Sequence, residues 1–245
     1  MRAVRYREIA DDLRLEVAGP DLAAGAILPS ESELCARYGA SRVTIRRALD
    51  VLRTEGLVES RQGFGWVVAG EPLRQDLSRL ATIDAQLASA GVRSRRRILD
   101  FGFVSAPQRV RGLLGEGQVL EVRRLHLADE QPLARVTVWC PQELGASLSR
   151  DDVERASFLE QLPVDLVGAT QTIGADAASP PDAELLGVPV GSPTLVVERI
   201  TRTERHRPVL VSEHVFPAHR MTFSIDVPLD AGMLDPAGMK VVTGD

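Results

Sequence analysis

The apolar residues of the first sixty positions recur at the spacing of helices. Residues 6–18 predict one amphipathic helix, which Gly19 and Pro20 end. A second is predicted between the cap residue Ser41 and Glu55-Gly56, because its apolar side chains return every three or four positions. Each helix therefore has one face that packs against the rest of a small domain. The buried positions are Ile9, Leu13 and Val17 in the first helix, and Ile45, Ala48, Leu49 and Leu52 in the second.

A short helix is predicted between these two. Ser30 and Glu33 have the spacing of a capping box, in which the serine oxygen accepts the amide of Glu33 and the carboxylate accepts the amide of Ser30. Gly39 ends this helix, and Ser41 caps the next one only two residues later. Two helices joined by so short a turn cross steeply, which predicts a helix-turn-helix.

A β-hairpin is predicted directly after the second amphipathic helix. Residues 57–60 and 66–68 are short β-rich runs on either side of a turn that contains Arg61, Gly63 and Gly65. A hairpin in this place makes the domain a winged helix. The two glycines allow backbone conformations that side chains disfavour, so the turn can approach a minor groove, and Arg61 adds a positive charge.

The pattern changes from helices to strands after Pro72. We place a linker at residues 71–78, between a first domain of residues 1–70 and a second of residues 79–245. The second domain is predicted to be a mostly antiparallel sheet with helices, so the fold class is α+β. Its predicted strands are residues 98–104, 119–128, 133–140, 170–178, 194–203, 209–216 and 222–227, and its predicted helices are residues 80–90, 107–114, 157–162 and 180–186.

The polar side of the second amphipathic helix carries candidate DNA contacts. Arg42, Arg46 and Arg47 lie in its first two turns, with Thr44 beside them and Ser41 at the cap. The start of such a helix can enter the major groove, where these side chains reach base edges and phosphates. A capped helix in an all-helical domain would explain the capping box alone, but it would not explain the hairpin that follows.

The net charge of −5 does not exclude a nucleic-acid partner. Residues 1–70 contain ten arginines and ten acidic residues, so the negative surplus belongs to the second domain. Within the first domain, acidic residues gather on the first helix and basic residues on the second amphipathic helix and the hairpin. Because local potential decides phosphate binding, we expect modest, salt-sensitive affinity for DNA.

Three segments of the first domain, LPSESEL, SRVTIRRALDVLRTEGLV and RQGFGWVV, resemble the DNA-binding domain of the GntR family of bacterial transcription regulators. The resemblance runs without gaps over roughly forty residues, so it is specific. It implies that double-stranded operator DNA is a partner and that Arg42 and Arg46 match the family's DNA-contacting arginines. Some family members carry an arginine where this chain has Ser32, so one contact is absent here.

The second domain resembles the UTRA domain, the effector-binding domain of the HutC subfamily, whose fold is like that of chorismate lyase. The segments AELLGVPVGSPTL at residues 183–195 and VRRLHLAD at residues 122–129 carry this resemblance, with Arg199 and Pro208. It implies a small-molecule effector and a regulator that is released from its operator when the effector binds. Family members answer to phosphosugars, phosphonate or phosphate, and carboxylates, and the segment from Pro208 to Pro217 looks most like the phosphonate-uptake regulators.

Five residues are candidate effector contacts. Arg124 and His126 continue the apolar face of their strand, where cations line a rim or meet an anion; a solvent-facing strand end is the alternative. The matching pair in UTRA domains is commonly Arg-x-Arg, so His126 is a departure from the family. Ser157 matches a family serine at the start of a short helix, and otherwise is a plain helix cap. Glu213 shares a face with apolar residues, so it should meet a cation such as Arg199, or a ligand hydroxyl.

Other functions find less support. The four histidines lack metal-ligand spacing, no catalytic constellation stands out, and Lys240 is the sole lysine, which argues against pyridoxal chemistry; we expect no metal, no cofactor and no catalytic residue. A small-molecule lyase or ligand-binding protein of chorismate-lyase-like fold is the alternative. Neither a signal peptide nor a membrane span is apparent, so we expect a cytoplasmic protein with reduced Cys35 and Cys140. We also expect a homodimer, because one small winged head buries too little DNA surface for tight specific binding.

Overall fold

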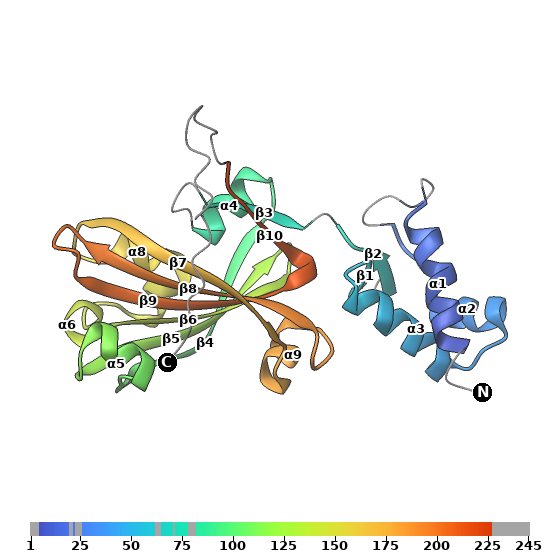
Figure 1. Ribbon diagram of the computed structural model, residues 1–245, viewed down its shortest axis with the longest axis horizontal. Coiled ribbons are helices and arrows are strands. Elements are labelled where there is room, and N and C mark those ends of the chain that lie inside the picture. The colour runs from blue at the N-terminus through green and yellow to red at the C-terminus, as the bar shows by residue number, and fades with distance from the viewer. Residues whose placement is uncertain are drawn as a thin grey trace, which may run out of the picture.

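The computed structural model describes residues 5–19, 22, 26–61, 65–70, 72–77 and 82–226, except for the side chain of residue 61. These residues form two units, which we call the head (residues 5–70) and the sheet domain (residues 73–226), at opposite ends of the long axis (Figure 1). The fold class is α+β, as predicted.

The head is a winged helix-turn-helix. Ser30 and Glu33 form the predicted capping box, and Gly39 ends the following helix in the left-handed conformation, with φ of 55°. The apolar side chains predicted for the long helices are buried, and Leu34 from the short helix joins them. The elements are α1 (Arg5–Val17), α2 (Glu31–Tyr38), α3 (Arg42–Thr54), β1 (Val58–Arg61) and β2 (Gly65–Val68), and the two strands pair antiparallel.

The predicted linker contains a strand, β3 (Leu73–Asp76), that belongs to the sheet domain. It pairs in parallel with β10 (Met221–Ser224), so the chain is fixed to the sheet domain soon after it leaves the head. The next described helix is α4 (Ile83–Ser89), which Thr82 caps. The first residues of the helix predicted at 80–90 lie outside the described part of the chain.

The sheet domain is built on a six-stranded antiparallel sheet with strand order β4-β5-β6-β9-β8-β7. The strands predicted between residues 98 and 216 are all present in this sheet. The strand predicted at residues 222–227 is not part of it: as β10 it pairs in parallel with β3, and residue 227 lies outside the described residues. The structure adds two short helices, α6 and α7, that the sequence pattern did not predict. The remaining elements are β4 (Ser94–Ser105), α5 (Gln108–Leu114), β5 (Gln118–Ala128), β6 (Gln131–Pro141), α6 (Gln142–Gly145), α7 (Arg150–Arg155), α8 (Phe158–Gln161), β7 (Leu166–Ala177), α9 (Pro180–Leu186), β8 (Pro193–Thr203), β9 (Pro208–Pro217) and the 3-10 helix η1 (Ala218–Arg220).

The sheet has two covered faces with different cores. On one face, which we call the pocket face, α4, α7 and α8 bury Leu87, Val153 and Phe158 against β5, β6 and β9. On the opposite face, α5 and α9 cover two smaller apolar clusters. The period-two pattern of β5 places Leu120 and Val122 in the larger core, so the residues that continue this face point toward the helices of the pocket face.

The head and the sheet domain meet at a joint formed by the α3–β1 turn and η1. The Cα of Gly56 lies so close to His219 that a Cβ at position 56 would lie 2.0 Å from the His219 Cβ. Beside it, Glu59 on β1 and Arg220 form an ion pair at 3.3 Å, with only 12% and 11% of the side chains exposed. Arg220 also donates to the carbonyl oxygens of Pro132 and Leu186, which ties the joint to the sheet domain.

We expect Gly56→Ala to open this joint, because the new methyl group cannot share space with the His219 side chain. Small-angle X-ray scattering should show a larger radius of gyration than wild type, and His219→Gly in the same protein should restore it. Gly39→Ala is the matched control: residue 39 also has positive φ, and both variants carry about 1 kcal/mol of left-handed backbone strain. An unchanged radius for Gly56→Ala would show that the joint does not hold the head.

Candidate DNA-binding surface and effector pocket

The start of α3 presents an exposed polar surface. Ser41 caps the helix by accepting the amide of Thr44 at 3.3 Å, and its hydroxyl lies 2.9 Å from that of Thr44. Arg42, Arg46 and Arg47 are exposed on the side that faces away from the core of the head. The predicted recognition residues on α3 therefore lie on one open surface, where a helix can be inserted into a major groove.

Two of these arginines are held by residues of α2. Arg46 donates through Nε to both carboxylate oxygens of Glu31 at 2.9 Å, and Arg42 donates to the Ser32 hydroxyl at 3.2 Å. The Arg46 hydrogen bonds hold the pKa of Glu31 below its usual value. The arginines are thus oriented before any DNA binds, while Glu31 offsets part of their charge. Sequence reasoning did not identify Glu31 in this role.

An open groove lies beside the start of α3. It has a volume of about 820 Å³ and runs between the first turn of α1 and the turn before α3, with Arg5 and Arg47 among its walls. Val43, which is 63% exposed, also lines it. Cations and an exposed methyl-bearing side chain suit a phosphate backbone and the methyl group of thymine.

The wing is described in part. Gly65 has φ of 85° and open space where a Cβ would lie, which agrees with the expectation that this turn needs glycine. Its partner across the hairpin is Arg61. Gly63 and the side chain of Arg61 lie outside the described residues, so their DNA contacts stay predictions.

Four of the five predicted effector residues line one cavity on the pocket face. Arg124 and His126 come from β5, Arg199 from β8, and Ser157 caps α8 above them. All four side chains are buried, with 1–8% exposed. The cavity measures about 40 Å³, which is room for only about three waters. A ligand larger than a small ion therefore requires the helices that cover the pocket to move.

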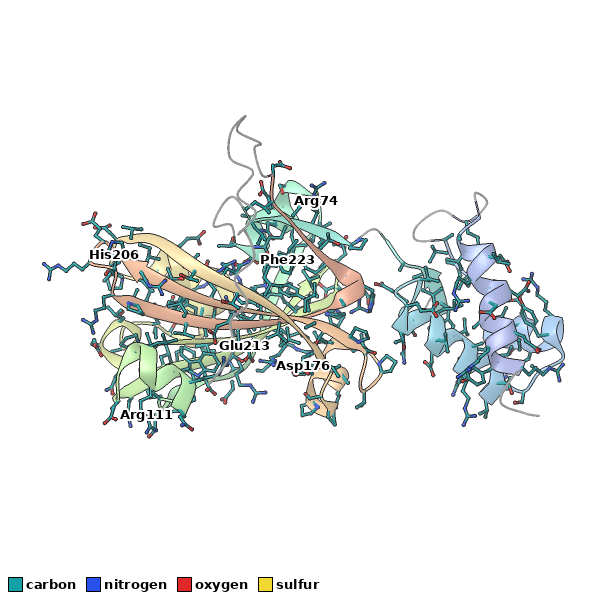
Figure 2. The ribbon with its side chains drawn as sticks, viewed as in Figure 1. Arg74, Arg111, Asp176, His206, Glu213 and Phe223 are labelled. Carbon is teal, nitrogen blue, oxygen red and sulfur yellow. The ribbon has the colours of Figure 1, made fainter. Side chains whose placement is uncertain are left out.

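Glu213 is the exception: it meets cations, as expected, but these are Arg109 and Arg135 rather than Arg199. Its carboxylate accepts hydrogen bonds from Arg109 at 2.7 Å and Arg135 at 2.6 Å, on the face covered by α5 and α9 (Figure 2). Alternation along β9 gives the reason, because its neighbours Ser212 and His214 take the pocket face instead. The same alternation would have identified Ser212 and His214 as pocket residues if the sequence had shown which face of the sheet carries the pocket.

The side chains in and beside the pocket include more arginines than carboxylates. Arg124 makes one long hydrogen bond, at 3.4 Å, to the Val153 carbonyl, and burial lowers the pKa of its guanidinium to about 10. Arg199 donates to the Gln171 side chain at 2.7 and 2.9 Å. Asp84 lines the cavity from α4, and Arg96 pairs with it. Two guanidinium groups therefore face the cavity without a carboxylate of their own, which favours an anionic ligand.

Both histidines of the pocket are neutral in this arrangement. Burial, followed by the nearby charges of Arg124 and Arg96, holds the pKa of His126 well below its usual value. Burial and the charge of Arg199 do the same for the pKa of His214. His214 has a partner, since its Nε2 lies 3.0 Å from the Ser212 hydroxyl, whereas neither ring nitrogen of His126 has one among the described residues.

Within the described ranges, no group of His, Cys, Asp and Glu side chains is arranged to hold a metal ion. No described helix is both long and apolar enough to cross a membrane.

Comparison with known proteins agrees with this geometry. Residues 5–68 match the model of bacterial regulatory proteins of the gntR family, and residues 89–222 match the UTRA domain. The chain is 37% identical over 229 residues to the HTH-type transcriptional regulator Rv0792c of Mycobacterium tuberculosis, which covers 90% of this chain and 85% of that protein. It is 26% identical to the transcriptional repressor NagR of Bacillus subtilis, covering 89% and 92%.

Among solved structures, PhnF from Mycobacterium smegmatis has a similar fold, with a TM-score of 0.61 at 22% identity over 90% of this chain and 99% of that one. The chain therefore belongs to the GntR family of transcription regulators, with a GntR head joined to a UTRA domain of the HutC type.

Proposed function

We propose that this protein is a repressor whose operator binding is controlled by a small acidic metabolite bound in the cavity of the pocket face. The observation that carries the proposal is the pair of buried guanidinium groups, Arg124 and Arg199, on a cavity in a domain separate from the DNA-binding head. A buried cation without an acid is costly, so an anion that enters this cavity is strongly stabilised.

The names of relatives support a repressor with a sugar-related effector. They include NagR, a probable fructoselysine utilization operon repressor of Escherichia coli and the mannosyl-D-glycerate system repressor MngR. Phosphosugars, phosphonates and carboxylates all present the anion that the cavity requires. The guanidinium groups would select for the anionic part of such a ligand.

Release from DNA follows from the position of α4. Thr82, Ile83 and Asp84 line the cavity at the start of this helix, and β3, the segment that follows the head, precedes it in the chain. A ligand too large for about 40 Å³ displaces this part of α4 and changes the path of the chain toward the head. The effector acts by favouring one arrangement of the two domains over the other.

The DNA-bound form is a homodimer in this proposal. One head buries too little DNA surface for tight specific binding, while two heads related by a two-fold axis read half-sites about 34 Å, or a multiple of that distance, apart. Protection of a pseudo-palindromic promoter fragment tests this directly.

Removing one recognition arginine should weaken operator binding. Arg42→Ala or Arg46→Ala takes away a contact to bases or neighbouring phosphates, and we expect affinity to fall roughly 5- to 150-fold in a gel-shift titration. Arg155→Ala is the control, because it removes the same charge from an exposed site in the sheet domain. Equal affinity of the recognition variants and the control would refute the assignment.

Removing Arg124 should separate effector response from DNA binding. A thermal-shift screen with phosphosugars, phosphonates and carboxylates identifies the effector, and operator titrations then measure release, which is typically about 5- to 150-fold. We expect Arg124→Ala to bind operator normally and to resist release. Arg123→Ala is the matched control, since the neighbouring residue on β5 points to the opposite face. Equal release from Arg124→Ala and wild type would place the pocket elsewhere.

A further inference from the structure

We propose that His126 is a proton-accepting part of the anion site, so that the pocket takes up a proton when a dianion binds and effector affinity rises as pH falls. This inference rests on the proposed function, because it concerns the same cavity. It adds a sensitivity to pH that the arginines alone do not provide.

His126 is placed at the floor of the cavity, where a ligand anion meets it. Its side chain is 1% exposed and lies between Arg96 on β4 and Ala134 on β6, its partners across the two neighbouring strands. Neither ring nitrogen has a hydrogen-bond partner among the described residues. A buried ring with two unused nitrogens costs free energy unless water or a ligand in the cavity satisfies them.

The elements packed around His126 contribute apolar, hydroxyl, charged and titratable side chains to this site. Val138 of β6 and Leu210 of β9 are apolar, and α8 contributes Ser157 and Phe158, whose ring lies 5.7 Å from the guanidinium carbon of Arg124. The charged and titratable groups are Arg124 on β5, Arg96 on β4, Asp84 on α4, Arg199 on β8 and His214 on β9.

The protein groups around His126 favour its neutral form. Burial and the charges of Arg124 and Arg96 all hold the pKa of the imidazole well below its usual value. A neutral ring has one N–H donor and one acceptor nitrogen, and an acceptor repels the oxygens of an anion. A dianion in the cavity reverses this balance, because it stabilises the imidazolium and turns both nitrogens into donors.

The direction of the pH effect follows from this difference. Because the pKa of His126 is higher with ligand than without it, binding takes up a proton at any pH between the two values. In that interval, affinity should increase up to about tenfold for each unit by which pH falls. Above the pKa of the complex, His126 is neutral in both states and affinity is independent of pH.

Sulfate is the probe, because its double charge is constant over the pH range in which histidines titrate. A change of sulfate affinity with pH therefore reports titration of the protein. Isothermal titration calorimetry on the full chain, at several pH values from about 6 to about 8 and in buffers of different ionisation enthalpy, measures both affinity and protons taken up. We expect tighter binding toward pH 6, with proton uptake approaching one per sulfate.

Two variants test whether His126 is the group that takes up the proton when sulfate binds. His126→Gln keeps a donor and an acceptor but cannot be charged, so sulfate binding should become independent of pH and lose proton uptake. His206→Gln is the control, because that histidine is exposed in the β8–β9 turn and should leave both readouts unchanged (Figure 2). Arg124→Ala should abolish sulfate binding at every pH.

The possible outcomes distinguish the proton uptake by His126 from the anion binding on which it depends. Binding that depends on Arg124 but has the same affinity at every pH would overturn the role of His126 and leave the anion pocket standing. Proton uptake that persists in His126→Gln would also overturn it. No sulfate binding at any pH, or binding that Arg124→Ala leaves intact, would overturn the anion pocket itself and the proton uptake with it.

Discussion

Buried positive charge is the constraint on which the sheet domain depends. Arg96, Arg124 and Arg199 are each less than 10% exposed on one face of the sheet, and a buried cation is costly unless acids or hydrogen bonds compensate it. Asp84 compensates Arg96, and Gln171 bonds Arg199, but Arg124 has only a long bond to a carbonyl. The domain thus folds at some cost in stability around a site that an anion would stabilise, and binding of such an anion would recover that cost.

The same constraint connects the cavity to the head. The pair formed by Asp84 and Arg96 joins the start of α4 to β4 beside the cavity, and in the proposed mechanism an incoming anion would compete with Asp84 for the nearby guanidinium groups. β3 lies just before α4 in the chain and pairs with β10, while β10 directly follows η1, which carries the joint residues His219 and Arg220. β3 and β10, the strands next to the segments that hold the head, are therefore paired with one another. In the proposed mechanism, a shift of α4 would act on them through the preceding chain. Coupling needs no contact between the ligand and DNA.

How much the sequence could predict depended on the range of the interactions. Caps and helical periodicity act within one or two turns, so the Ser30 capping box, the glycine end of α2 and the buried face of α3 followed from local spacing. Alternation likewise placed Arg124 and His126 on one face of β5. It could not say which face of β9 is covered by α8, so Glu213 was assigned to the wrong side. The strand β3 was also missed, because its only support is a partner near the other end of the chain.

The two candidate binding surfaces differ in how their arginines are compensated, which local sequence did not show. On α3, Arg46 is already engaged by Glu31, so a DNA phosphate would have to replace an internal carboxylate. The net gain in free energy would be the difference between two ion pairs, which is smaller than a full charge pair would give. In the pocket, Arg124 and Arg199 have only neutral hydrogen-bond partners, so an anion there would displace no carboxylate from them. A modest affinity for DNA beside a stronger anion site would suit a switch, because the effector would have to offset only a limited gain at the head.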